Sequence, residues 1–406
     1  TVNVTNGTLN IMQSPNLVGG AFTGGTWNIG PEAVVQVTGG ISNWAGIAKF
    51  IGNNPRINSS GGANALQFLA ENNGHLIFTQ GNSQSIFSNQ LISRGLIETD
   101  ATSSFSLSGA LNMQMGELKN RGTMSYNGGV TVTSGTVNFG GTISTPQFNH
   151  QGGVLSASHD GAGLGTLNGN LNLGLMSYMA VDVNPTTPAN SDRIQVNGTA
   201  SLGGAVQLRI PNGSTLPPGT DLTVVSSSNP IQGGFASIRV GFAQTLQGNA
   251  ATLTSLATIG TLTVVSGSIS LGDYMADPFG MPITISFSQG GVPMGSINTI
   301  IDESGNYFVM THLRGSFDVF ADATPWLRRK HPSPVVISDS GATGINFALQ
   351  NGDVDSSGEV DAVDIDSVIA AFGNTDPGIP QDVDGSNEVD ALDIDIVIAN
   401  FGGVDD

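Results

Sequence analysis

Two copies of one acidic pattern, 29 residues apart near the end of the chain, constrain the fold more than any other sequence feature. The first copy runs from Asp353 to Asp364 and the second from Asp382 to Asp393. Each copy places oxygen-bearing side chains at loop positions 1, 3, 5, 9 and 12, and the backbone carbonyl of position 7 lies between them. A hard cation such as Ca²⁺ takes about six to eight oxygen ligands from a tightly curled loop, and this spacing provides them.

The residues expected to form the two metal loops share this spacing. They are Asp353, Asp355, Ser357, Glu359, Asp361 and Asp364 in the first loop, and Asp382, Asp384, Ser386, Glu388, Asp390 and Asp393 in the second. The sharp curl of such a loop needs a left-handed residue at position 6. Gly358 adopts that conformation without steric cost, and Asn387 is among the few other residue types that tolerate it.

Each acidic loop is followed by apolar residues at helical spacing. They are Ile365, Val368, Ile369 and Phe372 after the first loop, and Ile394, Val397, Ile398 and Phe401 after the second. Gly373 and Gly402 stand where a helix C-terminal cap is expected. Each unit is therefore predicted to be a loop with one following helix.

A duplicated loop-helix unit of this kind resembles the dockerin module, which uses EF-hand calcium loops. The resemblance covers about 50 residues and implies that the tail binds two Ca²⁺ ions and docks onto a cohesin-type β-sandwich. Cellulosomal dockerins usually carry Ser or Thr at loop positions 10 and 11, where this chain has Ala362-Val363 and Ala391-Leu392. The resemblance therefore carries over the calcium ligands but not the choice of partner.

The net charge of −19 is concentrated in this tail. From Asn351 onward there are 15 acidic and no basic residues, whereas the first 350 residues hold 16 acidic and 12 basic ones. The negative charge therefore reflects metal binding, and without a basic stripe nucleic acid is excluded as a partner. The chain has no cysteine, which excludes disulfides and thiolate chemistry. No apolar run is long enough to span a membrane.

Residues 1–175 are predicted to form short strands separated by Gly, Asn and Ser. The usual frame is Gly, any residue, apolar, polar, apolar, as in residues 74–78 and 135–139. The frame recurs about every 20 residues, which predicts the stacked coils of a parallel β-solenoid. The stretch resembles the passenger-domain repeats of autotransporters, and an ordinary antiparallel sandwich stays open as the alternative.

The solenoid is expected to extend to residue 258, with a capping region from about residue 176. Residues 259–350 carry strand candidates at 262–265, 283–287, 307–310, 317–321 and 335–337. This spacing predicts a β-sandwich and resembles the carboxypeptidase-regulatory, or transthyretin-like, family. Residues 351–406 form the third predicted domain. The predicted fold class is therefore all-β, a parallel solenoid followed by a sandwich, with a small α-helical dockerin-like module.

No catalytic constellation is predicted, and the chain is expected not to be an enzyme. The histidines are scattered without metal-ligand spacing: His75, His150, His159, His312 and His331. Glu98 and Asp100 are the one closely spaced acidic pair in residues 1–175. They are expected to share one face of a strand, where a solvated strand end is a more common role than a catalytic dyad.

Three further segments carry hypotheses. Residues 326–330 (Trp-Leu-Arg-Arg-Lys) form the one basic cluster, which is either a solvated strand end or a contact for the acidic tail. Residues 1–5 alternate polar and apolar, and form either the first rung of their own solenoid or a strand added to a neighbouring copy. Candidate glycan acceptors lie in Asn-x-Ser/Thr sequons: Asn3, Asn6, Asn58, Asn197 and Asn212.

These features together suggest an extracellular or cell-surface structural protein, processed and secreted. It is expected to assemble head-to-tail with other copies of itself into a filament, tube or surface layer stabilised by calcium. The alternative is a carbohydrate-active or carbohydrate-binding secreted protein that its dockerin anchors to a cohesin-type scaffold.

Overall fold

A computed structural model describes residues 1–11, 16–158 and 161–406 of the chain, and the fold is mostly β. The chain divides into two compact units. The first comprises residues 1–211, 220–238 and 243–254, and the second comprises residues 212–219, 239–242 and 255–406. Both the predicted sandwich and the acidic tail therefore fall in the second unit.

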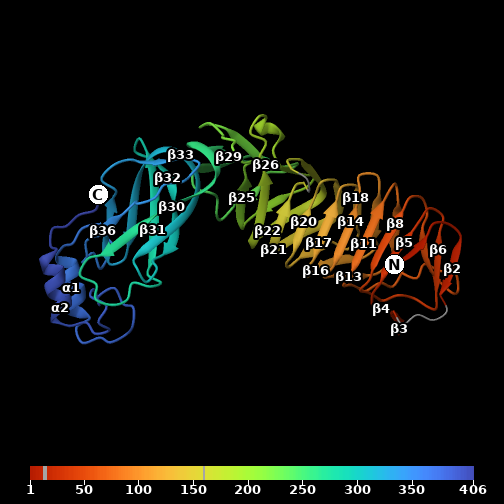
Figure 1. Ribbon diagram of the computed structural model, residues 1–406, viewed down its shortest axis with the longest axis horizontal. Coiled ribbons are helices and arrows are strands. Elements are labelled where there is room, and N and C mark those ends of the chain that lie inside the picture. Colours follow the sequence, from red (N-terminus) through yellow and green to blue (C-terminus); the bar gives the residue numbers. More distant parts are fainter. Residues whose placement is uncertain (12–15, 159–160) are drawn as a thin grey trace. The chain divides into compact units, whose positions relative to one another are not determined.

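The first unit is a parallel β-solenoid with three faces per turn (Figure 1). One face contains β1 (Val2–Val4), β5 (Thr26–Ile29), β8 (Ile47–Ile51), β11 (His75–Thr79), β14 (Leu96–Thr99), β17 (Glu117–Asn120), β20 (Thr136–Asn138) and β25 (Ala205–Arg209). The second contains β2 (Thr8–Ile11), β6 (Val34–Val37), β9 (Arg56–Ser59), β12 (Ser83–Ile86), β15 (Ser104–Leu107), β18 (Thr123–Tyr126), β23 (Arg193–Val196) and β26 (Asp221–Ser227).

The third face completes each turn. It contains β3 (Leu17–Val18), β4 (Ala21–Phe22), β7 (Asn43–Trp44), β10 (Glu71–Asn72), β13 (Gln90–Ser93), β16 (Ala110–Met113), β19 (Val130–Val132), β24 (Ala200–Leu202) and β27 (Gln232–Gly233). Two long bent strands, β21 (Thr142–Ser156) and β22 (Leu164–Asp182), contribute to all three faces. The remaining elements are η1 (Pro188–Asn190), β28 (Phe242–Gln247) and β29 (Ala250–Ser255).

A column of corner glycines explains the repeated Gly-x-apolar frame. A Cβ added at Gly95 would collide with the carbonyl oxygen of Gly74 in the turn beneath it. The same collision recurs in the following turns. An added Cβ at Gly116 would meet the carbonyl oxygen of Gly95, one at Gly135 that of Gly116, and one at Gly153 that of Gly135. The backbones of successive turns touch at this corner, so only glycine fits there.

Inward-facing side chains stack from turn to turn in the solenoid core. Phe78 lies between Phe50 and Phe105, with ring centroids 5.3 and 5.2 Å apart. At the N-terminal end, β1 pairs in parallel with β5 of its own chain, with Val2 opposite Trp27, so residues 2–4 form a first rung. At the other end, β26 pairs in parallel with β23 and antiparallel with β29. Strand β29 therefore covers the β26 edge of the last turn.

The β-sandwich of the second unit contains seven strands. They are β30 (Thr258–Leu271), β31 (Pro282–Gln289), β32 (Val292–Ile300), β33 (Asn306–Ala323), β34 (Trp326–Lys330), β35 (Val335–Ile337) and β36 (Phe347–Leu349). The two strands predicted at 307–310 and 317–321 are one strand, β33, because Gly315 bends it at a φ of 120° without ending it. Within the described residues, no helix has the length and apolarity that a membrane crossing needs.

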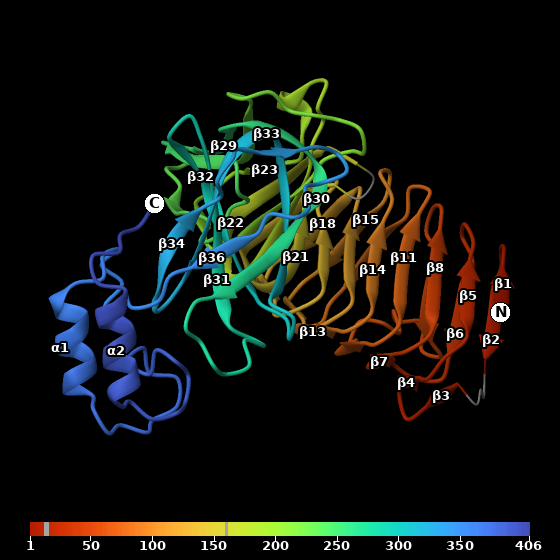
Figure 2. The ribbon, with the colours of Figure 1, turned by 60° about the vertical axis from the view of Figure 1, so that its left-hand side comes forward.

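The acidic tail forms two short helices that lie side by side, α1 (Ala362–Ala370) and α2 (Ala391–Ala399) (Figure 2). The two repeats interlock through the backbone. Val360 bonds to Gly402 and Gly403 at the end of the second repeat, and Val389 bonds to Gly373 and Asn374 at the end of the first. Neither repeat is thus complete alone, because each loop closes on the end of the other repeat's helix.

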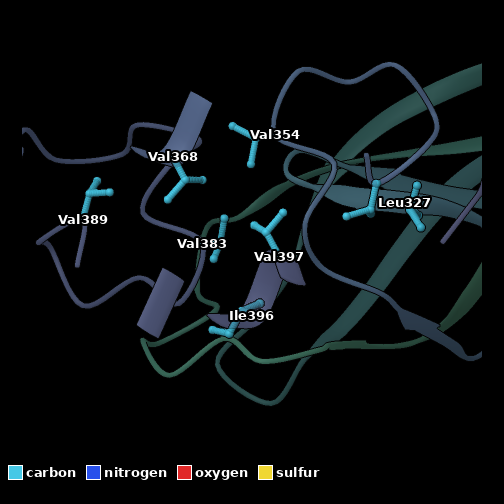
Figure 3. Packing of buried hydrophobic residues seen from close by; sticks show 8 residues of the cluster. Leu327, Val354, Val368, Val383, Val389, Ile396 and Val397 are labelled. Atoms are coloured by element: carbon cyan, nitrogen blue, oxygen red, sulfur yellow. The ribbon is translucent and has the colours of Figure 1, made fainter. Parts of the chain in front are cut away.

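One buried apolar cluster joins the tail to the sandwich (Figure 3). Leu327 of strand β34 is fully buried among tail residues, together with Val354 and Val383 from the loops and Val397 from α2. Gly352 and Asp353 also donate backbone hydrogen bonds to the carbonyl of Pro325. The tail therefore packs on its own sandwich.

Candidate metal centre

Each acidic loop gathers three carboxylates at one point. Asp353, Asp355 and Asp364 form the first triad, and in each triad the ligand oxygens lie within 4.8 Å of one another. The second triad consists of Asp382, Asp384 and Asp393. These are loop positions 1, 3 and 12, which the chain brings together from the two ends of each loop.

Backbone N–H groups hold the first loop closed around its triad. Ser357 and Gly358 donate to the Asp353 carboxylate at 2.8 and 3.0 Å. Val354 and Asp355 donate to Asp364 at 2.8 and 3.1 Å. The curl depends on left-handed residues at position 6, as predicted, because Gly358 has a φ of 85° and Asn387 in the second loop has a φ of 71°.

The second loop repeats three of these four bonds. Ser386 and Asn387 donate to the Asp382 carboxylate at 3.0 and 2.9 Å. Asp384 donates its N–H to Asp393 at 3.2 Å. Two loops that differ in sequence at positions 4, 6 and 11 thus reach similar geometry, which points to one shared function for the carboxylates that both loops carry.

Position 12 has two roles, because Asp364 and Asp393 are also the N3 residues of α1 and α2. Each forms a capping box with the preceding Asp, so that Asp361 accepts from Val363 N–H at 2.7 Å and Asp364 accepts from Asp361 N–H at 2.8 Å. Carboxylates there offset the positive end of the helix dipole. A structural change in the metal loop therefore directly alters the N-terminal capping of the helix.

The other expected ligands divide into two groups. At position 5, the Ser357 and Ser386 hydroxyls donate to the position 7 carbonyls of Glu359 and Glu388 at 3.1 and 3.0 Å. Positions 5 and 7 therefore approach each other within the loop, while the side chains of both glutamates are exposed. Asp361 and Asp390, at position 9, lie outside the triads and act as helix N-caps.

Burial raises the pKa of Asp353 above its usual value, and the neighbouring Asp364 and Asp355 add to this, although N–H donors from Gly358 and Ser357 oppose it. Burial likewise raises the pKa of Asp382. Carboxylates crowded together with few counter-charges are costly unless a cation lies between them. The donor set consists of oxygens alone, with carboxylates, a hydroxyl and a carbonyl in each loop. This set fits Ca²⁺ and not a metal that prefers nitrogen or sulfur.

Exposed apolar residues on the two helices and just after them are duplicated by the repeat. The helical spacing of the sequence does not distinguish these positions from buried ones, because Val368 and Val397 are fully buried while their neighbours Ile369 and Ile398 are 52% and 53% exposed. The exposed pairs related by the 29-residue repeat are Val363 and Leu392, Ile369 and Ile398, and Phe372 and Phe401. The two halves of the tail therefore expose the same three apolar positions.

Among the described residues outside the tail, no comparable group of metal-ligating side chains forms. Strand β14 ends at Thr99, so Asp100 is not beside Glu98 on a strand face as expected. Asp100 instead lies in a turn and accepts from Gln80 N–H at 2.6 Å and from Thr102, and N–H donation from Gln80 helps to lower its pKa against the effect of burial. His159 lies outside the described residues. Of the sequon asparagines, Asn58 is half-buried and the other four are exposed.

No family model and no curated protein matches this chain. Among the solved structures that match part of it are two crystal structures of a type II cohesin-X-dockerin complex from Acetivibrio cellulolyticus. The N-terminal interface mutant is 18% identical with a TM-score of 0.29, and the match covers 35% of this chain and 97% of that one. The C-terminal interface mutant is 20% identical with a TM-score of 0.28 and the same coverage.

Proposed function

We propose that this chain is an extracellular, non-enzymatic structural subunit whose tail binds two Ca²⁺ ions and then docks onto a partner. The observation that carries the proposal is the pairing of two oxygen triads with exposed apolar residues on and just after both helices, repeated at the same spacing. Ca²⁺ would be held by positions 1, 3, 5 and 12 and by the carbonyl of position 7 in each loop. The fold of the tail, a dockerin-type duplication, supports the same conclusion.

The partner that we propose first is another copy of the chain, because a chain that carries both a solenoid and a docking module offers two different surfaces for a head-to-tail contact. A contact between two different surfaces that does not close on itself gives an open filament, tube or layer. Exposed apolar residues such as Phe372 and Phe401 are suited to burial in such a contact. Calcium would stabilise the assembly by ordering the helices that carry them.

The second candidate is a carbohydrate-binding secreted protein that its dockerin-like tail anchors to a cohesin-type β-sandwich. It is supported by the resemblance of the tail to dockerins and by a polar groove on the sandwich, described below. The sandwich itself, with its transthyretin-like strand spacing, would serve in either case as a support for the tail.

The two candidates are separated by sedimentation velocity and negative-stain microscopy of the full chain with Ca²⁺ and with chelator. The first candidate predicts polymers in Ca²⁺ that dissociate on chelation. The double variant Phe372→Ala/Phe401→Ala should remain monomeric in Ca²⁺. The matched control Phe279→Ala, which removes an exposed phenylalanine outside the helices, should polymerise normally. If the wild-type chain stays monomeric in Ca²⁺, the self-assembly proposal is wrong and the second candidate, a protein anchored by its tail, is retained.

A further inference from the structure

The sandwich carries an open groove of about 890 Å³ over strands β30 and β36. Ser268 and Ser270 of β30 line it, together with Asn346, which directly precedes β36. Tyr274 and Pro278, from the loop at residues 272–281, line one wall. The volume is within the range of small-molecule binding sites in proteins.

Several polar groups that line the groove have no partner among the described residues. The Glu303 carboxylate has no hydrogen bond or ion pair there, and neither do the hydroxyls of Ser270 and Tyr274. The Asn346 side chain accepts from Ser268 through Oδ1, which leaves its Nδ2 free to donate. These groups offer donors and acceptors together with an aromatic ring and a proline ring.

The two cations that line the groove are already engaged. Arg329 bonds to the carbonyl of Val404 and to Gln350, and Lys330 pairs with Asp318 at 3.0 Å. Glu303 is therefore the one uncommitted charge among the lining residues that the structure describes. This balance does not favour an anion, and the mixture of neutral donors and acceptors suits hydroxyl groups, which both donate and accept.

One wall of the groove is held by the second metal loop. Met275 N–H donates to the carbonyl of Asp384 at 2.8 Å, and Gly385 packs so closely on the Tyr274 ring that an added Cβ would collide with it. Tyr274 also contacts Trp326 edge-to-face, with ring centroids 5.3 Å apart. Without a cation, the clustered Asp382, Asp384 and Asp393 repel one another, which would loosen the backbone that Met275 contacts.

We propose that this groove binds a short neutral oligosaccharide, and that a cation in the second loop is required for tight binding. Sugar rings present hydroxyls to Glu303, Asn346 and Ser270, and an apolar C–H face to Tyr274 or Pro278. The gating half of this proposal rests on calcium binding by the tail, as proposed above. The sugar-binding half of the proposal depends only on the residues of the sandwich.

Calorimetric titration of the calcium-loaded full chain with cellotriose, chitotriose, mannotriose and maltotriose tests the groove. We expect at least one of these sugars to bind, with affinity reduced about tenfold by Glu303→Ala, the loss of one hydrogen bond to a charged group. Asp376→Ala removes the same charge from an exposed site that does not line the groove, and should change affinity less than twofold. If no trisaccharide binds, or if Glu303→Ala binds like the wild type, the groove proposal is wrong.

Gating is tested by comparing Asp384→Asn with Asp355→Asn, which alter position 3 of the second and first loops. We expect Asp384→Asn to weaken sugar binding about as much as chelation, and at least fivefold more than Asp355→Asn does. Calcium binding is measured separately by titration of each variant. Equal effects of the two variants would refute gating by the second loop. If sugar affinity is the same with and without chelator, while the tail is shown to bind calcium, gating is refuted but the proposed function of the tail is not.

Discussion

The carboxylate of Asp405 accepts a hydrogen bond of 2.7 Å from the backbone N–H of Arg328. Beside it, Asp406 accepts from Lys330 N–H at 3.0 Å, and the Arg329 guanidinium lies 3.8 Å from the same carboxylate. The basic cluster at residues 326–330 thus meets the end of the acidic tail, which is one of its two predicted roles. The tail is attached at this edge by charge and, through Leu327, by apolar burial.

Leu327→Ala should detach the tail more than any surface change. Leu327 is fully buried among tail residues, so its truncation removes apolar contact and leaves a cavity. We expect a loss of about 2–5 kcal/mol in the stability of the tail. Hydrogen exchange of α1 and α2 measures this loss. Val336→Ala, at a residue 67% exposed on the same sandwich, is the control and should cost less than about 0.5 kcal/mol. Equal exchange in the two variants would contradict the packing role of Leu327.

Removal of calcium should unfold α1 and α2 and spare the solenoid. Each capping box includes a carboxylate of a metal triad, Asp364 or Asp393 at N3, so the loss of the cation destabilises the loop and the capping box together. Limited proteolysis with and without chelator, followed by mass spectrometry, should show new cleavage within residues 351–406 only. Identical protection of the tail in both conditions would count against both metal sites.

The ionisation of Asp353 and Asp382 should make the metal-free tail more stable near pH 4 than near pH 7. Folding raises the pKa of both residues above the usual value, so the folded state binds protons more tightly than the unfolded state. The resulting stability is present below the usual pKa and is lost as pH rises through the raised value. Calcium affinity should change in the opposite direction, because the ligands must lose their protons.

Urea unfolding in chelator, followed by hydrogen exchange in residues 351–406, measures this pH dependence. The double variant Asp353→Asn/Asp382→Asn should flatten it, because neither side chain can then titrate. A metal-free tail that becomes less stable on acidification in the wild type, and equally so in the double variant, would show that other groups dominate.

Gly95→Ala should destabilise the solenoid by about 1–3 kcal/mol or more, because its new Cβ would collide with the Gly74 carbonyl. Gly24→Ala is the matched control, since an added Cβ there meets nothing within 4 Å. Thermal unfolding monitored by β-sheet circular dichroism measures the difference. Equal melting temperatures for the two variants would mean that the turns do not stack closely at this corner.

The sequence predicted the repeating parts of this molecule well, because local rules define them. The Gly-x-apolar frame predicts rungs such as β11 and β14, since stacked corners admit only glycine. The acidic repeat predicts that Asp353 and Asp364 approach each other, since the loop spacing alone brings them together.

Long-range features were not predictable in the same way. The continuity of β33 through Gly315 depends on pairing with β30 and β31, which no local pattern reveals. The burial of Val368 and the exposure of Ile369 depend on which side of α1 faces Leu327, a residue distant in sequence. The groove beside Tyr274 likewise exists only after β36 has paired with β30.

The glycine column has a consequence for how the solenoid can change over time. Each rung contacts only its two neighbours, so a rung is a unit that can be duplicated or lost without redesigning either end. Residues 96–116 illustrate this, because Leu96 lies directly under Glu117 and deletion of the segment would join Gly95 to Glu117 in register. The solenoid would shorten by about 4.8 Å, one strand spacing. A lineage that keeps the corner glycines can therefore change the length of the solenoid in fixed increments, by recombination alone.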